Sequence, residues 1–207
     1  YFKVDSEGKQ LPYIDRLVSV QVEDVEMVNQ RVLSGDVDFL RESTALVKVP
    51  LYKENEENGG FNTVLTDMHV DSSALFLNQT FDDPTWRKVV QDVRFRQALS
   101  LAINRDEIIE SVYYGFASKP TVSVGEEFST YDVAKANALL DEMGLTERDA
   151  NGMRMVDGKP FSILLEHGAH APDLGPVAEL VSEQFKEIGI DLQVKQIDPQ
   201  LWDQRTL

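Results

Sequence analysis

Apolar residues recur at helical spacing in several segments of this chain, and strand-like segments lie between them. In residues 25–33 the valines and leucine fall on one helix face. Asp24 precedes this segment as a capping residue, and Gly35 follows it where a helix can end. The same signals predict further helices within residues 44–58, from Pro84 onward, in residues 93–103, 105–112, 133–143 and 177–188, and from Pro199 onward.

The strand-like segments are short and apolar. Residues 16–22 alternate apolar and polar side chains, and residues 74–77 contain an apolar run typical of a buried strand. The other candidates are residues 37–40, 61–65, 153–156, 161–166 and 191–197. Residues 16–40 therefore predict a parallel βαβ unit, and Asp157-Gly158 predicts a two-residue hairpin turn. The sequence predicts an α/β fold with a boundary near residues 78–84.

Charge and composition exclude several classes of protein. The formal net charge is −16, so the chain should repel a nucleic-acid backbone. Cysteine is absent, which excludes disulfides, thiolate metal sites and a cysteine nucleophile within it. No run approaches the roughly 18 apolar residues that a membrane span requires. Residues 1–5 carry no signal-peptide pattern, and both ends of the sequence look cut.

Two patterns suggest metal sites, and each has a simpler interpretation. His167 and His170 follow a predicted strand, with Glu166 and Asp173 nearby as further ligands. Loop histidines are more often solvated, so no metal is predicted. Residues 149–152 (DANG) resemble the start of a calcium loop, but the later ligands do not follow. A turn leading into the hairpin is the favoured interpretation.

Catalytic patterns are not found. The sequence contains no nucleophile elbow, phosphate-binding glycine loop or zinc-protease helix. Trp202 on the last predicted helix is equally compatible with a ligand-stacking role and with a core position. The chain is therefore predicted not to be an enzyme and to need no cofactor.

Residues 92–110 (DVRFRQALSLAINRDEIIE) resemble the most recognisable segment of the family 5 bacterial extracellular solute-binding proteins. Other stretches resemble the same family in the same order along the chain. They are residues 8–16 (GKQLPYIDR), 32–39 (VLSGDVDF), 131–145 (YDVAKANALLDEMGL), 178–192 (AELVSEQFKEIGIDL) and 202–205 (WDQR). Arg94 and Arg96 in the first stretch are expected to make structural contacts to carboxylates or helix ends.

The resemblance implies a periplasmic-binding-protein-like fold (class II), of which the chain forms parts of the first and third lobes. Residues 1–78 would belong to the first lobe and residues 79–207 to the third. It further implies solute capture for an ABC importer, by closure of two lobes around a peptide or another small polar solute. Permease subunits would be the partners, and the location periplasmic or extracellular, with or without a lipid anchor. The alternative is a sensory or protein-interaction domain on the same scaffold.

The predicted ligand-binding residues lie at two places. Asn78, Gln79 and Thr80 follow an apolar run where the lobes would cross. His167, Gly168 and His170 follow a strand end, where open α/β sheets usually bind ligands, and Trp202 lies on the last helix. The main third-lobe contacts of the family are expected beyond Leu207.

Overall fold

The computed structural model describes residues 2–22, 24–41, 44–66, 73–119, 126–169 and 171–206. Its first elements are helix α1 (Val25–Leu33), the short 3-10 helix η1 (Leu46–Lys48) and helix α2 (Val49–Gly59). The later elements are α3 (Pro84–Val90), α4 (Val93–Ala102), α5 (Arg105–Ser111), α6 (Glu126–Ser129), α7 (Val133–Glu142), β1 (Met155–Val156), β2 (Lys159–Pro160), β3 (Ser162–Gly168), α8 (Leu174–Glu187), β4 (Asp191–Ile197) and α9 (Pro199–Thr206).

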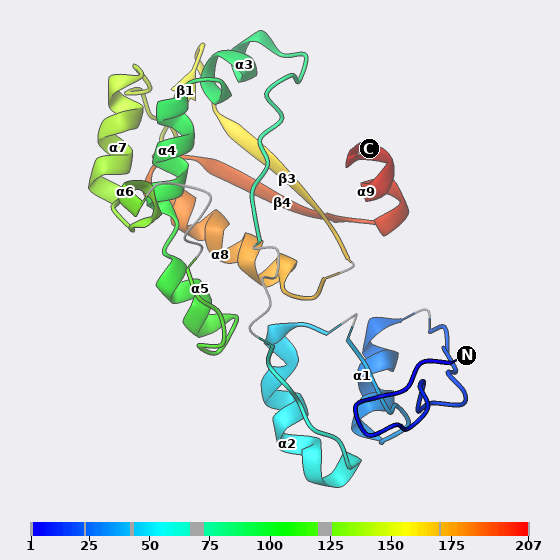
Figure 1. Cartoon of the computed structure of the whole chain (residues 1–207). Helices are drawn as coiled ribbons and strands as arrows, with labels where there is room; N and C mark the ends of the chain where they lie inside the picture. Colours follow the sequence, from blue (N-terminus) through cyan, green and yellow to red (C-terminus); the bar gives the residue numbers. More distant parts are fainter. Residues whose placement is uncertain are drawn as a thin grey trace.

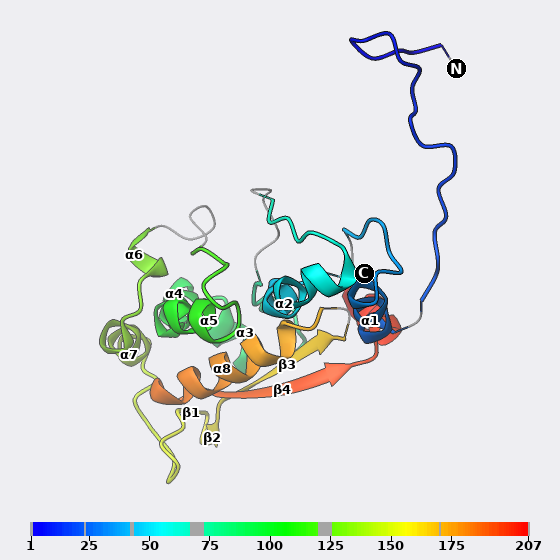
Figure 2. The same ribbon diagram turned by 90° about the horizontal axis from the view of Figure 1, so that it is seen from below.

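These elements form an N-terminal part (residues 2–66) and a larger body (residues 84–206). In the N-terminal part, α1 packs against α2, as Figure 1 shows in blue and cyan. In Figure 2 residues 2–22 run away from α1 as an extended trace. Residues 73–77 lie between the two parts in the sequence and are called the connecting segment, and Leu75 and Leu77 pack against the core of the body.

The body is built on a parallel pair of strands. β3 pairs with β4 from Ser162 opposite Asp191 to Gly168 opposite Ile197. α8 connects the two strands and packs against one face of the pair; Figure 2 shows α8 between the strands and the layer of α4 and α5. The core lies in these layers, and its most completely buried apolar side chains include Phe95, Leu101, Leu140, Phe185 and Ile190.

The other face of the strand pair is more open. Leu164 on β3 points away from α8 and is 58% exposed. In the part of the chain that the structure describes, β3 and β4 pair only with each other. Each of these two strands therefore has one edge without a strand partner.

The helix start predicted at the capping residue Asp24 is confirmed, and other helices also begin at a capping aspartate. The side chains of Asp24, Asp83, Asp92 and Asp132 each accept a hydrogen bond from a backbone N–H in the first turn of the following helix. Asn104 caps α5 in the same way, through the N–H of Glu107. The backbone N–H of Asn104 donates to Gln184 Oε1 at 3.1 Å and not to the Glu107 side chain, so Asn104 and Glu107 do not form a reciprocal capping box.

Arg94 and Arg96 make structural contacts, as expected. Arg94 Nη2 lies 2.6 Å from Asp92 Oδ2, and Arg94 Nη1 donates to the carbonyl of Glu142 at the end of α7. Arg96 Nη1 donates to the carbonyl of Val90 at 2.6 Å. The hydrogen bonds and charge of Arg94 hold the pKa of the Asp92 carboxyl below its ordinary value, so this cap stays charged.

The hairpin at Asp157-Gly158 is confirmed but short. β1 and β2 pair antiparallel around this turn, and both turn residues have positive φ, 50° at Asp157 and 75° at Gly158. That conformation is typical of two-residue hairpin turns. The predicted second arm, residues 161–166, instead belongs to β3 and pairs with β4.

The predictions of strands in residues 16–22, 37–40, 61–65 and 74–77 are wrong, and so is the βαβ unit of residues 16–40. These segments form no strand ladder in the structure. A strand requires hydrogen bonds from a neighbouring strand, and alternation alone does not supply one. Val18 is 63% exposed, Phe39 83% and Phe76 91%, so residues 74–77 are not buried throughout. A parallel strand–helix–strand unit does occur, in β3, α8 and β4.

Gly35 ends α1 where the chain passes close to the end of α2. Its φ is +77°, and a Cβ atom there would lie 2.7 Å from the carbonyl oxygen of Gly59. Gly35→Ala should destabilise the packing of α1 on α2 by about 2 kcal/mol or more, through the left-handed backbone and the clash together. Amide hydrogen exchange in α1 and α2 would measure this. Gly60→Ala is the control, since Gly60 has φ +67° but an open Cβ position; equal effects would contradict the proposed clash.

Candidate functional site

The carboxyl ends of β3 and β4 lie side by side. The register places Glu166 opposite Lys195, His167 opposite Gln196 and Gly168 opposite Ile197. The chain then leaves β3 toward α8 and leaves β4 directly into α9. Ligands of open α/β sheets usually bind at such an edge, so this end of the strand pair is the candidate site.

His167 lies on the side of β3 that faces α8. Its Cε1 atom is 3.7 Å from the position that a Cβ atom on Gly175 would take, so the ring packs close to the first turn of α8. Its Nδ1 atom is 3.2 Å from the carbonyl oxygen of Gly168, and Gly168 itself is buried. This neighbourhood fixes the ring at the strand end.

Glu166 lies on the opposite side of β3, where it is paired with two cations. Arg205 Nη1 contacts both carboxylate oxygens of Glu166, and Lys195 Nζ lies 3.6 Å from Oε1. The hydrogen bond from Arg205 is the main reason that the pKa of Glu166 is lowered. The ion pair fastens α9 to β3 across the end of the strand pair.

Trp202 lies on α9, three residues before Arg205, and therefore on the same side of that helix. Its side chain is half-buried, and α9 contacts β3. The structure thus brings Trp202, His167 and Gly168 to the same end of the strand pair. Their role in ligand binding stays a prediction.

Asn78, Gln79 and Thr80 are exposed and lie elsewhere. Asn78 Oδ1 accepts hydrogen bonds from the backbone N–H and the hydroxyl of Thr80. Trp86 Nε1 donates to the carbonyl of Asn78 at 2.6 Å, and Gln91 Nε2 donates to that of Gln79 at 2.8 Å.

The turn at residues 78–80 lies near the start of β3. The Trp86 ring, which holds this turn, stacks on Phe161 with 5.7 Å between ring centroids, and Phe161 directly precedes β3. Seven residues of strand span roughly 20 Å. The structure therefore separates Asn78, Gln79 and Thr80 from His167, Gly168 and Trp202.

The predicted residue His170 lies outside the described residues, and so does His69. Among the residues that are described, no group of three or more His, Asp or Glu side chains is placed to hold a metal ion. No helix in the same ranges has the length and apolar character needed to cross a membrane.

A hydrogen-bonded group beside the site was not predicted. Tyr113 Oη, just after α5, donates to Asp173 Oδ2 at 2.8 Å, and Ser73 Oγ lies 3.0 Å from the same hydroxyl. Ser73 lies 40 positions and Asp173 lies 60 positions from Tyr113 in the sequence. No spacing rule links positions so far apart, so sequence reasoning had no signal for them.

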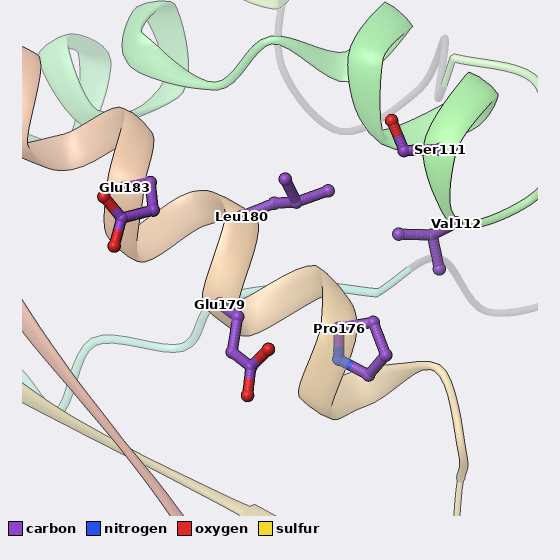
Figure 3. Close-up of a pocket in the computed structure, with 6 residues that line it drawn as sticks. All are labelled: Ser111, Val112, Pro176, Glu179, Leu180 and Glu183. Carbon is purple, nitrogen blue, oxygen red and sulfur yellow. The ribbon is translucent and has the colours of Figure 1, made fainter.

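An open groove of about 520 Å³ runs between α5 and α8. Figure 3 shows Leu180 of α8 pointing toward Val112, which directly follows α5, with Glu179 and Glu183 along the other side of α8. Ser111 and Pro176 complete the lining. These residues differ from those predicted at the end of the strand pair, so the groove is a separate surface feature.

Comparison with known proteins gives a family match over the complete sequence. Residues 1–207 match the family described as bacterial extracellular solute-binding proteins, family 5 Middle. The nickel-binding periplasmic protein of Escherichia coli (strain K12) is 28% identical over 170 residues, which are 78% of this chain and 31% of that protein. The oligopeptide-binding protein AppA of Bacillus subtilis (strain 168) is 24% identical, over 93% of this chain and 37% of that protein.

Solved structures agree. The oligopeptide-binding protein OppA superposes with a TM-score of 0.64 at 31% identity, covering 89% of this chain and 32% of that one. AppA of Bacillus subtilis, solved in complex with a nonapeptide, gives a TM-score of 0.65 at 23% identity, over 88% of this chain and 36% of AppA. The chain spans about a third of the length of the curated relatives that it matches.

Proposed function

The chain belongs to the bacterial extracellular solute-binding proteins of family 5, and from that premise we propose that it takes part in solute capture for an ABC import system. The solute is a peptide or another small polar molecule, and capture involves no catalysis. The observation that carries the proposal is the family match over all 207 residues, joined to a fold shared with oligopeptide-binding proteins. The proposed location is the periplasm or the outer cell surface, where ABC permease subunits would be the partners.

Two features of the structure support capture between lobes. The N-terminal part and the body have separate buried residues: Val32, Val49 and Tyr52 lie in the first, and the main core lies entirely in residues 89–192. The segment 73–77 connects them. Residues 1–78 then correspond to part of a first lobe and residues 79–207 to part of a third, which can close on a solute about this connection.

Peptide is the favoured solute class. Relatives with peptide-binding names include AppA, and OppA shares 31% identity with this chain in the aligned region. The nickel-binding relative of Escherichia coli makes a metal complex the second candidate. Calorimetric titration of the protein as its gene encodes it would distinguish them, with a mixture of tripeptides and with nickel(II)–histidine as probes. Heat with neither probe would contradict both candidates.

Trp202→Ala should weaken binding of the peptide probe by roughly thirtyfold, since a buried tryptophan contact contributes about 2 kcal/mol at an interface. The control is Leu201→Ala, which removes a partly exposed side chain from the same helix. Calorimetry measures the affinity, and thermal unfolding measures the stability. A variant that loses stability but binds as tightly as the unaltered protein would show Trp202 to be a packing residue only.

A further inference from the structure

The hydroxyl of Tyr113 joins three segments that are distant in sequence. Ser73 begins the connecting segment 73–77, Tyr113 follows α5, and Asp173 immediately precedes α8. A carboxylate accepts hydrogen bonds and has no proton to give, so the single proton of Tyr113 goes to Asp173, at 2.8 Å. The 3.0 Å contact between Ser73 and Tyr113 must then use the proton of Ser73. The three side chains therefore form a chain of two hydrogen bonds that runs from Ser73 through Tyr113 to Asp173, and this chain is called the relay.

The relay diverts Asp173 from its usual role. Asp173 occupies the capping position of α8, where an aspartate normally accepts a bond from a backbone N–H of the first turn. Here its side chain makes no capping bond and binds Tyr113 instead. Asp24, Asp83, Asp92 and Asp132 all cap their helices in this structure. The Asp173 side chain therefore binds Tyr113, which is distant in the sequence, in place of a backbone N–H in the first turn of α8.

Tyr113 is suited to hold this contact. Its side chain is partly buried against the core of the body, and burial raises the pKa of its hydroxyl to about 12. The hydroxyl consequently stays protonated at neutral pH and keeps donating to Asp173. Because Asp173 lies in the connection between the carboxyl end of β3 and α8, the relay runs from the edge of the candidate site to the segment between the two parts.

We propose that Ser73, Tyr113 and Asp173 form a latch that fastens the connecting segment 73–77 to the body and so sets the position about which the N-terminal part moves. Leu75 and Leu77 hold the same segment through apolar packing, and the latch fixes its N-terminal end. The use of this movement in solute capture rests on the proposed function. The latch itself is a property of the chain without solute, so it can be tested separately.

Spin-label distance measurement tests the latch directly. These 207 residues contain no cysteine, so within them Phe76→Cys and Glu179→Cys place one label on the exposed side of the segment and one on α8; any cysteine elsewhere in the protein is first replaced by serine. The measurement uses the protein as its gene encodes it, without added solute. Tyr113→Phe removes one oxygen atom and should raise the equilibrium constant for release of the segment about fivefold, because the neutral hydrogen bond from Ser73 to the Tyr113 hydroxyl is lost. The distribution of distances between the two labels should then broaden.

Control variants separate the latch from general loosening. Tyr114→Phe makes the same change at a neighbouring tyrosine whose side chain is largely exposed, and it should leave the distribution unchanged. Ser73→Ala, on an exposed residue, should broaden it without affecting the fold of the body. Adding Ser73→Ala to Tyr113→Phe should produce no further broadening, since both break one relay. If the Tyr113→Phe and Tyr114→Phe distributions coincide, or if the Ser73 and Tyr113 effects simply add, the latch is refuted.

Discussion

Replacing Arg154 by methionine should destabilise the body by about 3–5 kcal/mol. The Arg154 side chain is only 1% exposed, and it binds polar groups from several elements. Its Nε donates to the carbonyl of Ile188 at 2.8 Å, and its Nη2 donates to Asn137 Oδ1 at 2.7 Å. Its Nη1 contacts Asp141 Oδ1 at 2.6 Å and the carbonyl of Leu145. Methionine fills similar volume but leaves the buried carbonyls without donors.

Urea unfolding of the body measures this loss, and Arg148→Met is its matched control. Arg148 binds the same Asn137 Oδ1 atom, at 2.8 Å, and the carbonyl of Gly152, but its side chain is exposed. The control should cost less than about 1 kcal/mol. Similar losses of unfolding free energy for the two variants would mean that the buried hydrogen bonds of Arg154 stabilise the body no more than the exposed hydrogen bonds of Arg148.

Phe95→Ala should destabilise the body by a similar amount, about 3–5 kcal/mol, because it opens a cavity in a fully buried position. The Phe95 ring packs edge-on against Phe161 at 5.6 Å, and Phe161 in turn stacks on Trp86. This chain of rings joins α4, the start of β3 and α3. Its loss should therefore reduce the stability of all three together.

Phe95→Leu keeps most of the volume and should cost only about 1 kcal/mol. Phe76→Ala is the surface control, because that ring is almost fully exposed and its loss should be close to neutral. Denaturant unfolding followed by the fluorescence of Trp86 and Trp202 measures all three variants. A small effect of Phe95→Ala would show that the neighbouring rings collapse into the space.

Helices were predictable from the sequence because their signals are local. A capping aspartate, such as Asp24 or Asp132, lies within three residues of the N–H that it binds, and a glycine such as Gly144 marks the end. The hairpin turn at residues 157–158 is equally local. In each case the decisive contact falls within the same few residues that carry the pattern.

Strands were less predictable, because the partner of a strand lies elsewhere in the chain. Residues 16–22 and 191–197 both alternate apolar and polar side chains, yet only the second segment forms a ladder. Its partner β3 begins 29 positions earlier, at Ser162 opposite Asp191. The alternation shows that a segment can be a strand, and the partner decides whether it becomes one.

For the candidate site, too, predictability depends on whether the contacts of a residue are local in the sequence. His167 and Gly168 lie at the carboxyl end of β3, as expected from a local strand pattern, and their role in ligand binding stays a prediction. The relation of Asn78 to this edge depends on the packing of Trp86 on Phe161, which no local pattern encodes. The bonds of Tyr113 to Ser73 and Asp173 are non-local for the same reason.

The unpaired edges of β3 and β4 also bear on how the chain behaves in solution. Free backbone N–H and C=O groups along a strand can pair with another polypeptide, and an exposed apolar residue such as Leu164 strengthens that association. Lys195 on β4, with a side chain 56% exposed, opposes it, because stacked strands would bring like charges together. Charged side chains on unpaired strands disfavour such association, so replacement of Lys195 by a neutral β-branched residue should lower the yield of soluble protein.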